Sequence, residues 1–486
     1  MILVVRVTHS DISEITSSVF RQLGAAGTMY DCLAVAVPPR IPTPLNRRLQ
    51  LRVAVKDCFF LKGLKNSLCN RAYYDFSDYA PFTAKVVQTL ARDGAHILGF
   101  TKLSSMIARE EPTDAVDFKT AFNPRGDGYQ SPAGSSSGSA VSVAAYPWVD
   151  CAIGTDTSGS GRRPALVNGV WQFRPSHELV DLDGIVKTYP AFDTPCVFAR
   201  DLAIIKHVLE AWVPNTTPTG AAGPEKQQFE IIYPVDYFPV ANEDQQDLIE
   251  KFVDDVRCFL GATVTKLSIR ESWKTSHPPD TPDNIDTFLN DVVTRTYYYQ
   301  FYHSSDTFRQ TYAKAYDGRP PYVIPFVRRR WARGSSVSSD DHREATARMN
   351  IYKVWLHDLL FSSRKSTALV VLPISTIEPN YRDTTSPSPE EQSALDELFL
   401  PPILGAPDIA VPIGEVTYDS RISNQEEYLP VVVDVVGAPG SDLRLLGAVE
   451  TVMMRSKRPT IVETGARMFP PQKTWLVELD ERYPVA

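Results

Sequence analysis

The amino-acid sequence predicts an α/β fold, and three observations support that class. Short apolar segments typical of strands alternate along the chain with longer segments whose apolar residues recur at helical spacing. The connections between them are short, as in strand–helix–strand units with parallel strands. Apolar residues make up 43% of the 486 residues, so the chain can bury a large core and is not disordered over most of its length.

The first predicted elements form a strand–helix–strand unit. Residues 51–55 alternate in polarity and predict a strand that runs into Lys56. Residues 83–94 predict a helix with an apolar face and with Thr83 as its N-cap. Residues 95–99 predict a short buried strand. This order indicates two parallel strands joined by a helical crossover.

The same order returns in the second half of the chain. Residues 229–235 and 263–267 predict strands on either side of a helix over residues 247–260. A further helix is predicted over residues 340–361, with Ser338 or Ser339 as its N-cap. A strand is predicted after it, over residues 368–372.

Residues 270–337 differ from the rest because they are rich in aromatic side chains. We interpret them as a helical subregion laid over the sheet. The tyrosines within residues 297–302 either line an acyl pocket, since aromatic walls suit apolar substrates, or pack in the core. Their helical spacing favours the core.

Charge, cysteine and hydropathy patterns exclude several classes of function. Fifty basic and 58 acidic side chains give a net charge of −8, which argues against a nucleic-acid partner. The six cysteines are dispersed without a CxxC pair and no HExxH occurs, so we expect no disulfide framework and no metal site. No signal-peptide pattern and no membrane-length apolar stretch is present, so we expect a cytoplasmic location.

Residues 131–165 contain two clusters of serine and glycine, and their context excludes the common interpretations. A flexible linker is excluded because the clusters adjoin apolar runs at 140–145 and 151–153, which predict buried elements. The P-loop pattern GxxxxGK[ST] and the dinucleotide pattern GxGxxG are both absent. The GxSxG elbow of α/β-hydrolases has no clean copy at a strand-to-helix turn.

Several motifs, in a fixed order, carry a resemblance to a known family. They are VAVKD (53–57), GAHILGFT (94–101), PAGSSSGSA (132–140), GTDTSGSGR (154–162), GVWQFRP (169–175) and APDIAVP (406–412). On these motifs the chain resembles the amidase signature family of Ser-cisSer-Lys hydrolases over about residues 50–450, patchily through 210–365.

The resemblance implies a catalytic role for three residues. By motif position Ser160 resembles the nucleophile, Ser135 the relay serine in a cis peptide, and Lys56 the terminal base. A serine attacks an acyl carbon only when a base removes its proton, and a neutral lysine can do so. Lowering a lysine pKa from about 10.4 to near 7 corresponds to roughly 4–5 kcal/mol, which burial beside an apolar strand can supply.

The loop before the nucleophile has supporting roles in this interpretation. The backbone N–H groups of Thr157, Ser158 and Gly159 would face the developing oxyanion. Asp156 is expected to order the loop by binding nearby N–H groups rather than to act as an acid or base.

Two assignments have alternatives. Arg162 either binds an acidic substrate or braces the loop. The spacing between the two serine clusters is one residue longer than is usual in the family, so counting back from Ser160 makes Ser136 an alternative relay to Ser135.

The resemblance also implies an architecture, a central twisted mixed β-sheet covered by helices on both faces. We expect an N-terminal segment (1–50) that packs on the core, a core with the catalytic motifs (51–228), a variable helical cap (229–365) and a C-terminal part of the core (366–486).

Three hypotheses describe the function. The first is hydrolysis of a linear carboxylic amide, or of an ester, through a serine acyl-enzyme. The second is acyl transfer to an amine or alcohol by the same residues, and the third is a non-catalytic scaffold or partner protein with this fold. The first two imply a small-molecule amide or ester substrate and no cofactor, and relatives allow a homodimer.

Overall fold

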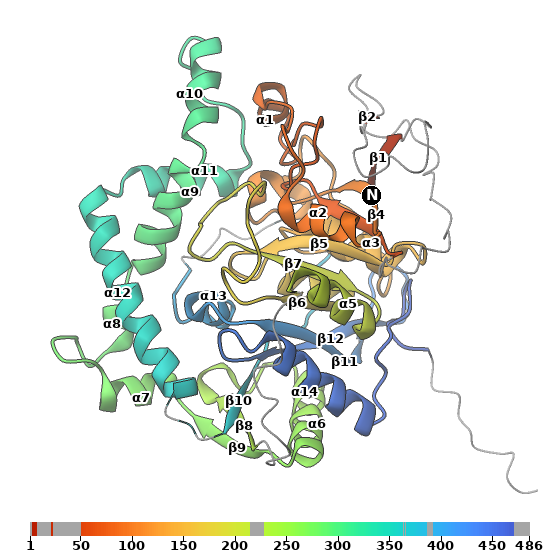
Figure 1. Cartoon of the computed structure of the whole chain (residues 1–486), viewed down its shortest axis with the longest axis vertical. Coiled ribbons are helices and arrows are strands. Elements are labelled where there is room, and N and C mark those ends of the chain that lie inside the picture. The colour runs from red at the N-terminus through yellow and green to blue at the C-terminus, as the bar shows by residue number, and fades with distance from the viewer. Residues whose placement is uncertain are drawn as a thin grey trace, which may run out of the picture.

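One mixed β-sheet runs through the molecule (Figure 1). The computed structural model describes residues 2–6, 21–22, 50–213, 228–362, 364, 366–385 and 392–470. Within them, twelve strands pair in the order β2-β1-β4-β3-β5-β7-β6-β11-β12-β10-β8-β9. The strands are β1 (Ile2–Arg6), β2 (Arg21–Gln22), β3 (Arg52–Lys56), β4 (His96–Thr101), β5 (Cys151–Asp156), β6 (Trp171–Arg174), β7 (Thr194–Ala199), β8 (Phe229–Pro234), β9 (Thr263–Leu267), β10 (Thr367–Leu372), β11 (Asp408–Asp419) and β12 (Glu426–Val436).

Helices cover both faces of the sheet, as predicted. In the described residues they are α1 (Arg71–Phe76), α2 (Lys85–Arg92), α3 (Ser137–Ala145), α4 (Arg162–Asn168), α5 (Leu202–Trp212), α6 (Glu243–Leu260), α7 (Ile269–Ser276), α8 (Ile285–Phe288), α9 (Tyr299–His303), α10 (Asp306–Ala315), α11 (Pro325–Ser335), α12 (Ser339–His357), α13 (Leu400–Leu404) and α14 (Asp442–Arg455). Helices α2, α5, α14 and α6 contact one another in that order on one face, and α3 and α4 pack together on the other.

The sheet has a parallel block toward each end and an antiparallel centre. β3 pairs in parallel with β4 and β5, and β8 pairs in parallel with β9 and β10. The strands between these blocks pair antiparallel. Parallel neighbours need a long crossover, which α2, α3 and α6 supply. The predicted α/β class and the mixed sheet are confirmed.

The elements predicted from periodicity are present, with some shifted ends. The strand predicted over 263–267 is β9, with the same bounds. Helix α2 follows Ala84, so the prediction that Thr83 is its N-cap is wrong, because Thr83 Oγ1 accepts the N–H of Lys62 instead. Helix α12 begins as predicted after Ser338, whose hydroxyl accepts the N–H of Asp341.

Helix α3 lies unusually close to the sheet. It consists of serine, glycine, alanine and valine, and eight of its nine residues are buried. Its Gly138 faces the backbone of Lys102, where a Cβ atom would lie 2.5 Å from a carbonyl oxygen. The small residues of this motif therefore bring the start of the helix against β3 and β5.

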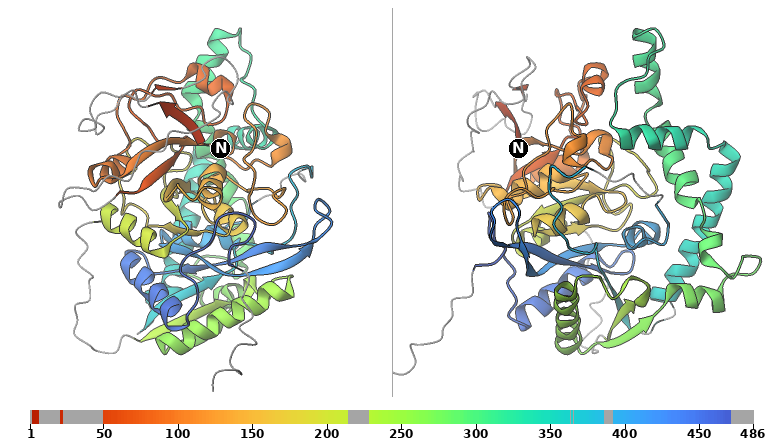
Figure 2. Two further views of the ribbon diagram at one scale, coloured as in Figure 1. Left: turned by 90° about the vertical axis from the view of Figure 1, so that its right-hand side faces the viewer. Right: turned by 180° about the vertical axis from the view of Figure 1, so that it is seen from behind.

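Helices α7 to α12 form a layer along one side of the sheet (Figure 2). The helical subregion predicted over residues 270–337 is present, whereas β8 and β9 belong to the sheet, so the helical layer begins at Ile269 rather than near residue 229. Tyr297 is buried and stacks on Tyr189 with ring centroids 5.4 Å apart. Tyr297 and Tyr298 thus follow the core alternative, whereas Tyr299 and Tyr302 are only partly buried.

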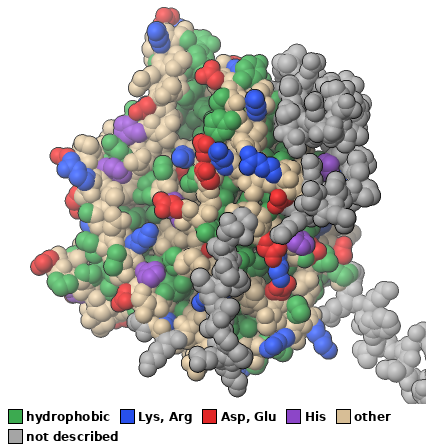
Figure 3. All heavy atoms as spheres, in the orientation of Figure 1, with side chains coloured by type: hydrophobic (Ala, Val, Ile, Leu, Met, Phe, Trp, Pro, Cys, Tyr) green, Lys and Arg blue, Asp and Glu red, His purple; other side chains and the backbone are tan. Residues whose placement is uncertain are grey.

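The N-terminal segment is described only at β1 and β2. β1 pairs antiparallel with β4, which places this segment on the outer side of the first parallel block. The other residues of 1–49, and residues 471–486, lie outside the described part. None of the helices described is long and apolar enough to span a membrane. On the face seen in Figure 3, basic and acidic side chains of the described residues are interspersed.

Candidate active site

Lys56 is the last residue of β3, and its side chain is fully buried. Its Nζ lies 2.9 Å from Oγ of Ser135, 2.9 Å from Oγ of Ser136 and 2.8 Å from Oγ1 of Thr155. All three partners are neutral hydroxyl groups. Burial lowers the pKa of Lys56, because a charged ammonium loses hydration that hydroxyls replace only in part.

Ser135 and Ser136 immediately precede α3 and are both buried. The peptide bond between Gly134 and Ser135 is cis. Ser136 Oγ donates to the carbonyl of Thr155 over 3.0 Å, and the Thr155 N–H approaches the same Oγ at 3.3 Å. A Cβ atom on Gly154 would lie 2.8 Å from Ser136 Oγ, so β5 reaches the serine only because residue 154 is glycine. The structure thus joins β3, β5 and the start of α3 through four side chains, which we call the serine–lysine cluster: Lys56, Ser135, Ser136 and Thr155.

Ser160 lies in the loop between β5 and α4, and Asp156 shapes that loop. The Asp156 carboxylate accepts three backbone N–H groups at 2.8–3.2 Å, from Gly159, Gly161 and Arg162. The Ser160 carbonyl accepts the N–H of Ser136 over 3.1 Å, so the loop is attached directly to the serine–lysine cluster. Ser160 itself is half-buried, in contrast to the buried cluster below it.

The three residues expected to supply oxyanion donors differ in the hydrogen bonds that they already make. The N–H of Gly159 is used by Asp156, so it is not free to face an oxyanion in this arrangement. Gly159 has φ of +100°, a conformation that glycine adopts without strain, and it turns the chain here. The Thr157 hydroxyl donates to Asp193 over 2.5 Å and fixes the start of the loop. Thr157 and Ser158 remain as the candidate donors.

Arg162 does not match its substrate-binding alternative. Its side chain is fully buried, and its guanidinium donates to the Asp156 carboxylate at 3.0 and 3.2 Å and to the Leu398 carbonyl at 2.9 Å. A guanidinium enclosed in this way cannot meet a substrate. The expectation that Arg162 binds an acidic substrate is therefore wrong, and it braces the loop.

Two residues of the site were not identified from the sequence. Thr155 supplies the third hydroxyl to Lys56, and its strand position suggested only β-propensity. Asp193 accepts from Thr157 and from both the N–H and the hydroxyl of Thr188, and it comes from a separate segment before β7. A carboxylate that orders two loops leaves no local signal in the sequence.

A narrow enclosed hollow, with room for about one water molecule, lies beside Thr155. Its other lining residues include apolar and polar side chains, among them Ile107, Leu182, Ile185, Thr188 and Asp193. Its lining therefore combines apolar side chains with Thr155 of the serine–lysine cluster.

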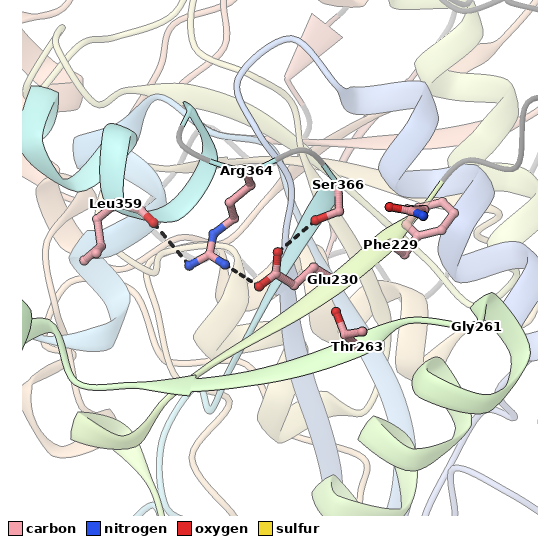
Figure 4. Close-up of a pocket in the computed structure, with 8 residues that line it drawn as sticks. Phe229, Glu230, Gly261, Thr263, Leu359, Arg364 and Ser366 are labelled. Carbon is pink, nitrogen blue, oxygen red and sulfur yellow. Dashed lines mark hydrogen bonds and ion pairs between the residues drawn. The ribbon is translucent and has the colours of Figure 1, made fainter.

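A larger, open hollow lies at the other end of the sheet, beside β8 and β9 (Figure 4). Glu230 pairs there with Arg364 and also accepts from Ser366 over 2.8 Å and from Thr265 over 2.6 Å. Because these partners already occupy both charged groups, the hollow offers no reactive side chain comparable to Lys56.

Sequence comparisons connect the chain to characterised proteins. A family model described as Amidase matches residues 51–446. Amidase 1 of Oryza sativa subsp. japonica is 34% identical over 217 residues, which are 45% of this chain and 47% of that protein. Mandelamide hydrolase of Pseudomonas putida is 25% identical over 442 residues, covering 86% of this chain and 81% of that protein. The match to the first of these relatives thus spans less than half of its length.

Solved structures share the fold. The structure of 6-aminohexanoate cyclic dimer hydrolase superposes with a TM-score of 0.64 at 19% identity, covering 83% of this chain and 84% of that one. At this identity the likeness concerns the fold alone.

Proposed function

Because the chain belongs to the amidase family, with residues 51–446 matching its model, we propose that it hydrolyses carboxylic amides through an acyl-enzyme formed on Ser160. The observation that carries this proposal is the buried contact of Lys56 with Ser135, beside the loop that presents Ser160. Lys56 is the base in this mechanism and Ser135 the relay.

The hydrogen-bonding capacity of a neutral lysine supports Ser135 as the relay. Neutral Lys56 has two N–H donors and one lone pair for its three hydroxyl partners. Ser136 donates its own hydroxyl to the Thr155 carbonyl, so it must accept from Lys56. The Ser135 hydroxyl has no other hydrogen bond among the described residues. It is thus suited to donate to the lysine lone pair and to accept from Ser160.

The proposed reaction then proceeds in balanced steps. Ser160 Oγ forms a bond to the acyl carbon while its proton passes to Ser135 and the proton of Ser135 passes to Lys56. The C–N bond breaks as the same route returns a proton to the leaving nitrogen. Water then attacks the ester carbon while its proton passes to Lys56, the bond from that carbon to Ser160 Oγ breaks, and Ser160 regains a proton as the acid leaves. The N–H groups of Thr157 and Ser158 are proposed to bind the oxyanion.

We propose open-chain amides as the substrates. A relative named mandelamide hydrolase is consistent with an open-chain amide. A panel of short-chain, aryl and cyclic amides tests this choice directly.

The test of the proposed function is labelling with a fluorophosphonate followed by peptide mapping. We expect label on Ser160, and we expect Ser160→Ala to lose both label and amide turnover, because no other group can form the acyl-enzyme. Adding amines or alcohols during turnover separates hydrolysis from acyl transfer. Labelling at another residue, or no reaction with any amide or ester by a folded protein, would refute the proposal.

A further inference from the structure

A second buried polar group lies directly beneath the Ser160 loop. Its members are all charged residue types and at most 1% exposed; we call them the buried charge cluster: Asp156, Arg162, Arg174, Asp408 and Asp434. They come from β5, α4, β6, β11 and β12 and so connect the loop to the centre of the sheet.

Strand register brings the two distant aspartates together. Asp408 is the cross-strand partner of Arg174 in β6 and of Val436 in β12. Asp434 is two residues from Val436, and side chains two apart on a strand share a face. The carboxyl groups of Asp408 and Asp434 are therefore diagonal neighbours on one face of the sheet.

Arg162 is the centre of the cluster. Beyond its bonds to Asp156, its Nε lies 3.6 Å from Asp408 Oδ2 and its Nη1 lies 3.6 Å from Asp434 Oδ2. Arg174 approaches Asp156 at 3.9 Å, but it donates to two backbone carbonyls, those of Ala406 and Phe192. Three carboxyl groups thus face two guanidinium groups.

The carboxyl groups are not equivalent. Asp156 accepts three N–H groups and the short bonds of Arg162, which outweigh the effect of burial and hold its pKa well below the usual range. Among the described residues, Asp408 has no hydrogen bond on either carboxyl oxygen, and Asp434 has none on Oδ1. Burial raises the pKa of Asp408 to about 7, against the opposing effect of Arg162, and burial also raises the pKa of Asp434.

Charge counting decides the protonation state. With all three carboxyls ionised, the cluster would carry one uncompensated negative charge in the interior, which is strongly unfavourable. One proton held between Asp408 and Asp434 makes the cluster neutral. Other titratable or polar groups also face the two aspartates or the arginines of the cluster from neighbouring elements. They are Gln172, His177, Cys196, Glu397 and Asp442.

We propose that Asp408 and Asp434 hold one proton between them and, in this neutral state, act as positioning residues that keep Arg162 beneath the Ser160 loop. The catalytic part of this inference rests on the proposed function, whereas the protonation state does not. A carboxyl with a raised pKa keeps a proton that the unfolded chain has lost. Its contribution to stability therefore declines as pH rises from the usual carboxyl pKa of about 3.9 through the raised value.

The first experiment measures the protonation state without using activity. Asp408→Asn and Asp434→Asn each replace the shared proton with a neutral amide, so each should abolish the decline in melting temperature that the shared proton causes between about pH 4 and pH 7. Each should also remove the carbonyl stretch of a buried protonated carboxyl from the infrared spectrum. Asp150→Asn is the matched control, because Asp150 is also buried and accepts the N–H of Arg52 outside the cluster.

The second experiment measures positioning. The double variant Asp408→Asn/Asp434→Asn leaves an uncompensated guanidinium, and we expect it to lower kcat by at least about tenfold with KM changed less than about twofold. Its loss of melting temperature should exceed the sum of the single losses. Single variants that keep the wild-type pH dependence, or an additive double variant, would overturn the proposal. Absence of Ser160 labelling with an intact pH signature would refute only the proposed function.

Discussion

The serine–lysine cluster and the buried charge cluster are both fully enclosed, yet they handle charge in opposite ways. Lys56 meets three neutral hydroxyls, whereas Arg162 meets three carboxyl groups. Burial therefore lowers the pKa of Lys56, while ion pairing keeps Arg162 charged. Burial thus favours a reactive base where the contacting groups are neutral hydroxyls, and a fixed structural contact where they are carboxylates.

The largest effect is expected when the base is replaced by a cation that cannot lose its proton. Lys56→Arg should lower kcat/KM by about 10³-fold or more, because arginine stays protonated and general base catalysis is lost. The matched control is Lys102→Arg, since Lys102 is also buried but is paired with Glu110 at 2.6 Å. Near-normal turnover of Lys56→Arg would remove the proposed distinction between the clusters.

Removing Arg162 should strongly destabilise the folded protein. Arg162→Met leaves Asp156 buried without its partner, and we expect the free energy of unfolding to fall by about 3–5 kcal/mol. Arg257→Met removes an exposed arginine paired with Asp254 and should lower stability far less, because water screens an exposed ion pair. Denaturant unfolding followed by circular dichroism compares the two. Equal losses would show that the buried ion pair does not brace the fold.

The smallest effects are expected from replacing Ser135 and Ser136 of the serine–lysine cluster. Ser135→Ala should lower kcat by about 10²-fold and leave residual activity, because water can replace a relaying hydroxyl. Ser136→Ala removes a group that donates to the Thr155 carbonyl and should lower kcat by about tenfold or less. Steady-state kinetics on one amide distinguishes them. The reverse order would make Ser136 the relay.

The site residues that the family resemblance assigns lie within ordered motifs, and their roles stay predictions. Lys56 follows a strand whose apolar pattern is local, and Ser135 and Ser160 lie in glycine-rich turns beside buried elements. These signals depend only on neighbouring residues, so they survive without knowledge of the tertiary structure.

The surroundings of Arg162 could not be predicted in the same way. Its partners Asp408 and Asp434 are more than two hundred residues away, and only the pairing of β11 with β6 and β12 brings them beneath α4. Without that register, a substrate contact and a buried brace look identical in the sequence. The start of α2 differs from its prediction for a similar reason. The Thr83 hydroxyl accepts the N–H of Lys62 and so does not cap the helix.

Lys56 is proposed to act as an uncharged base, and the pH dependence of fluorophosphonate labelling at Ser160 tests this proposal. Because burial lowers the pKa of Lys56, the labelling rate should rise with pH and level off below the pKa of about 10.4 of a free lysine. Lys56→Met should lose this rise. A rate that follows a pKa at or above that of free lysine, or a rise that persists in Lys56→Met, would show that Lys56 is not the base.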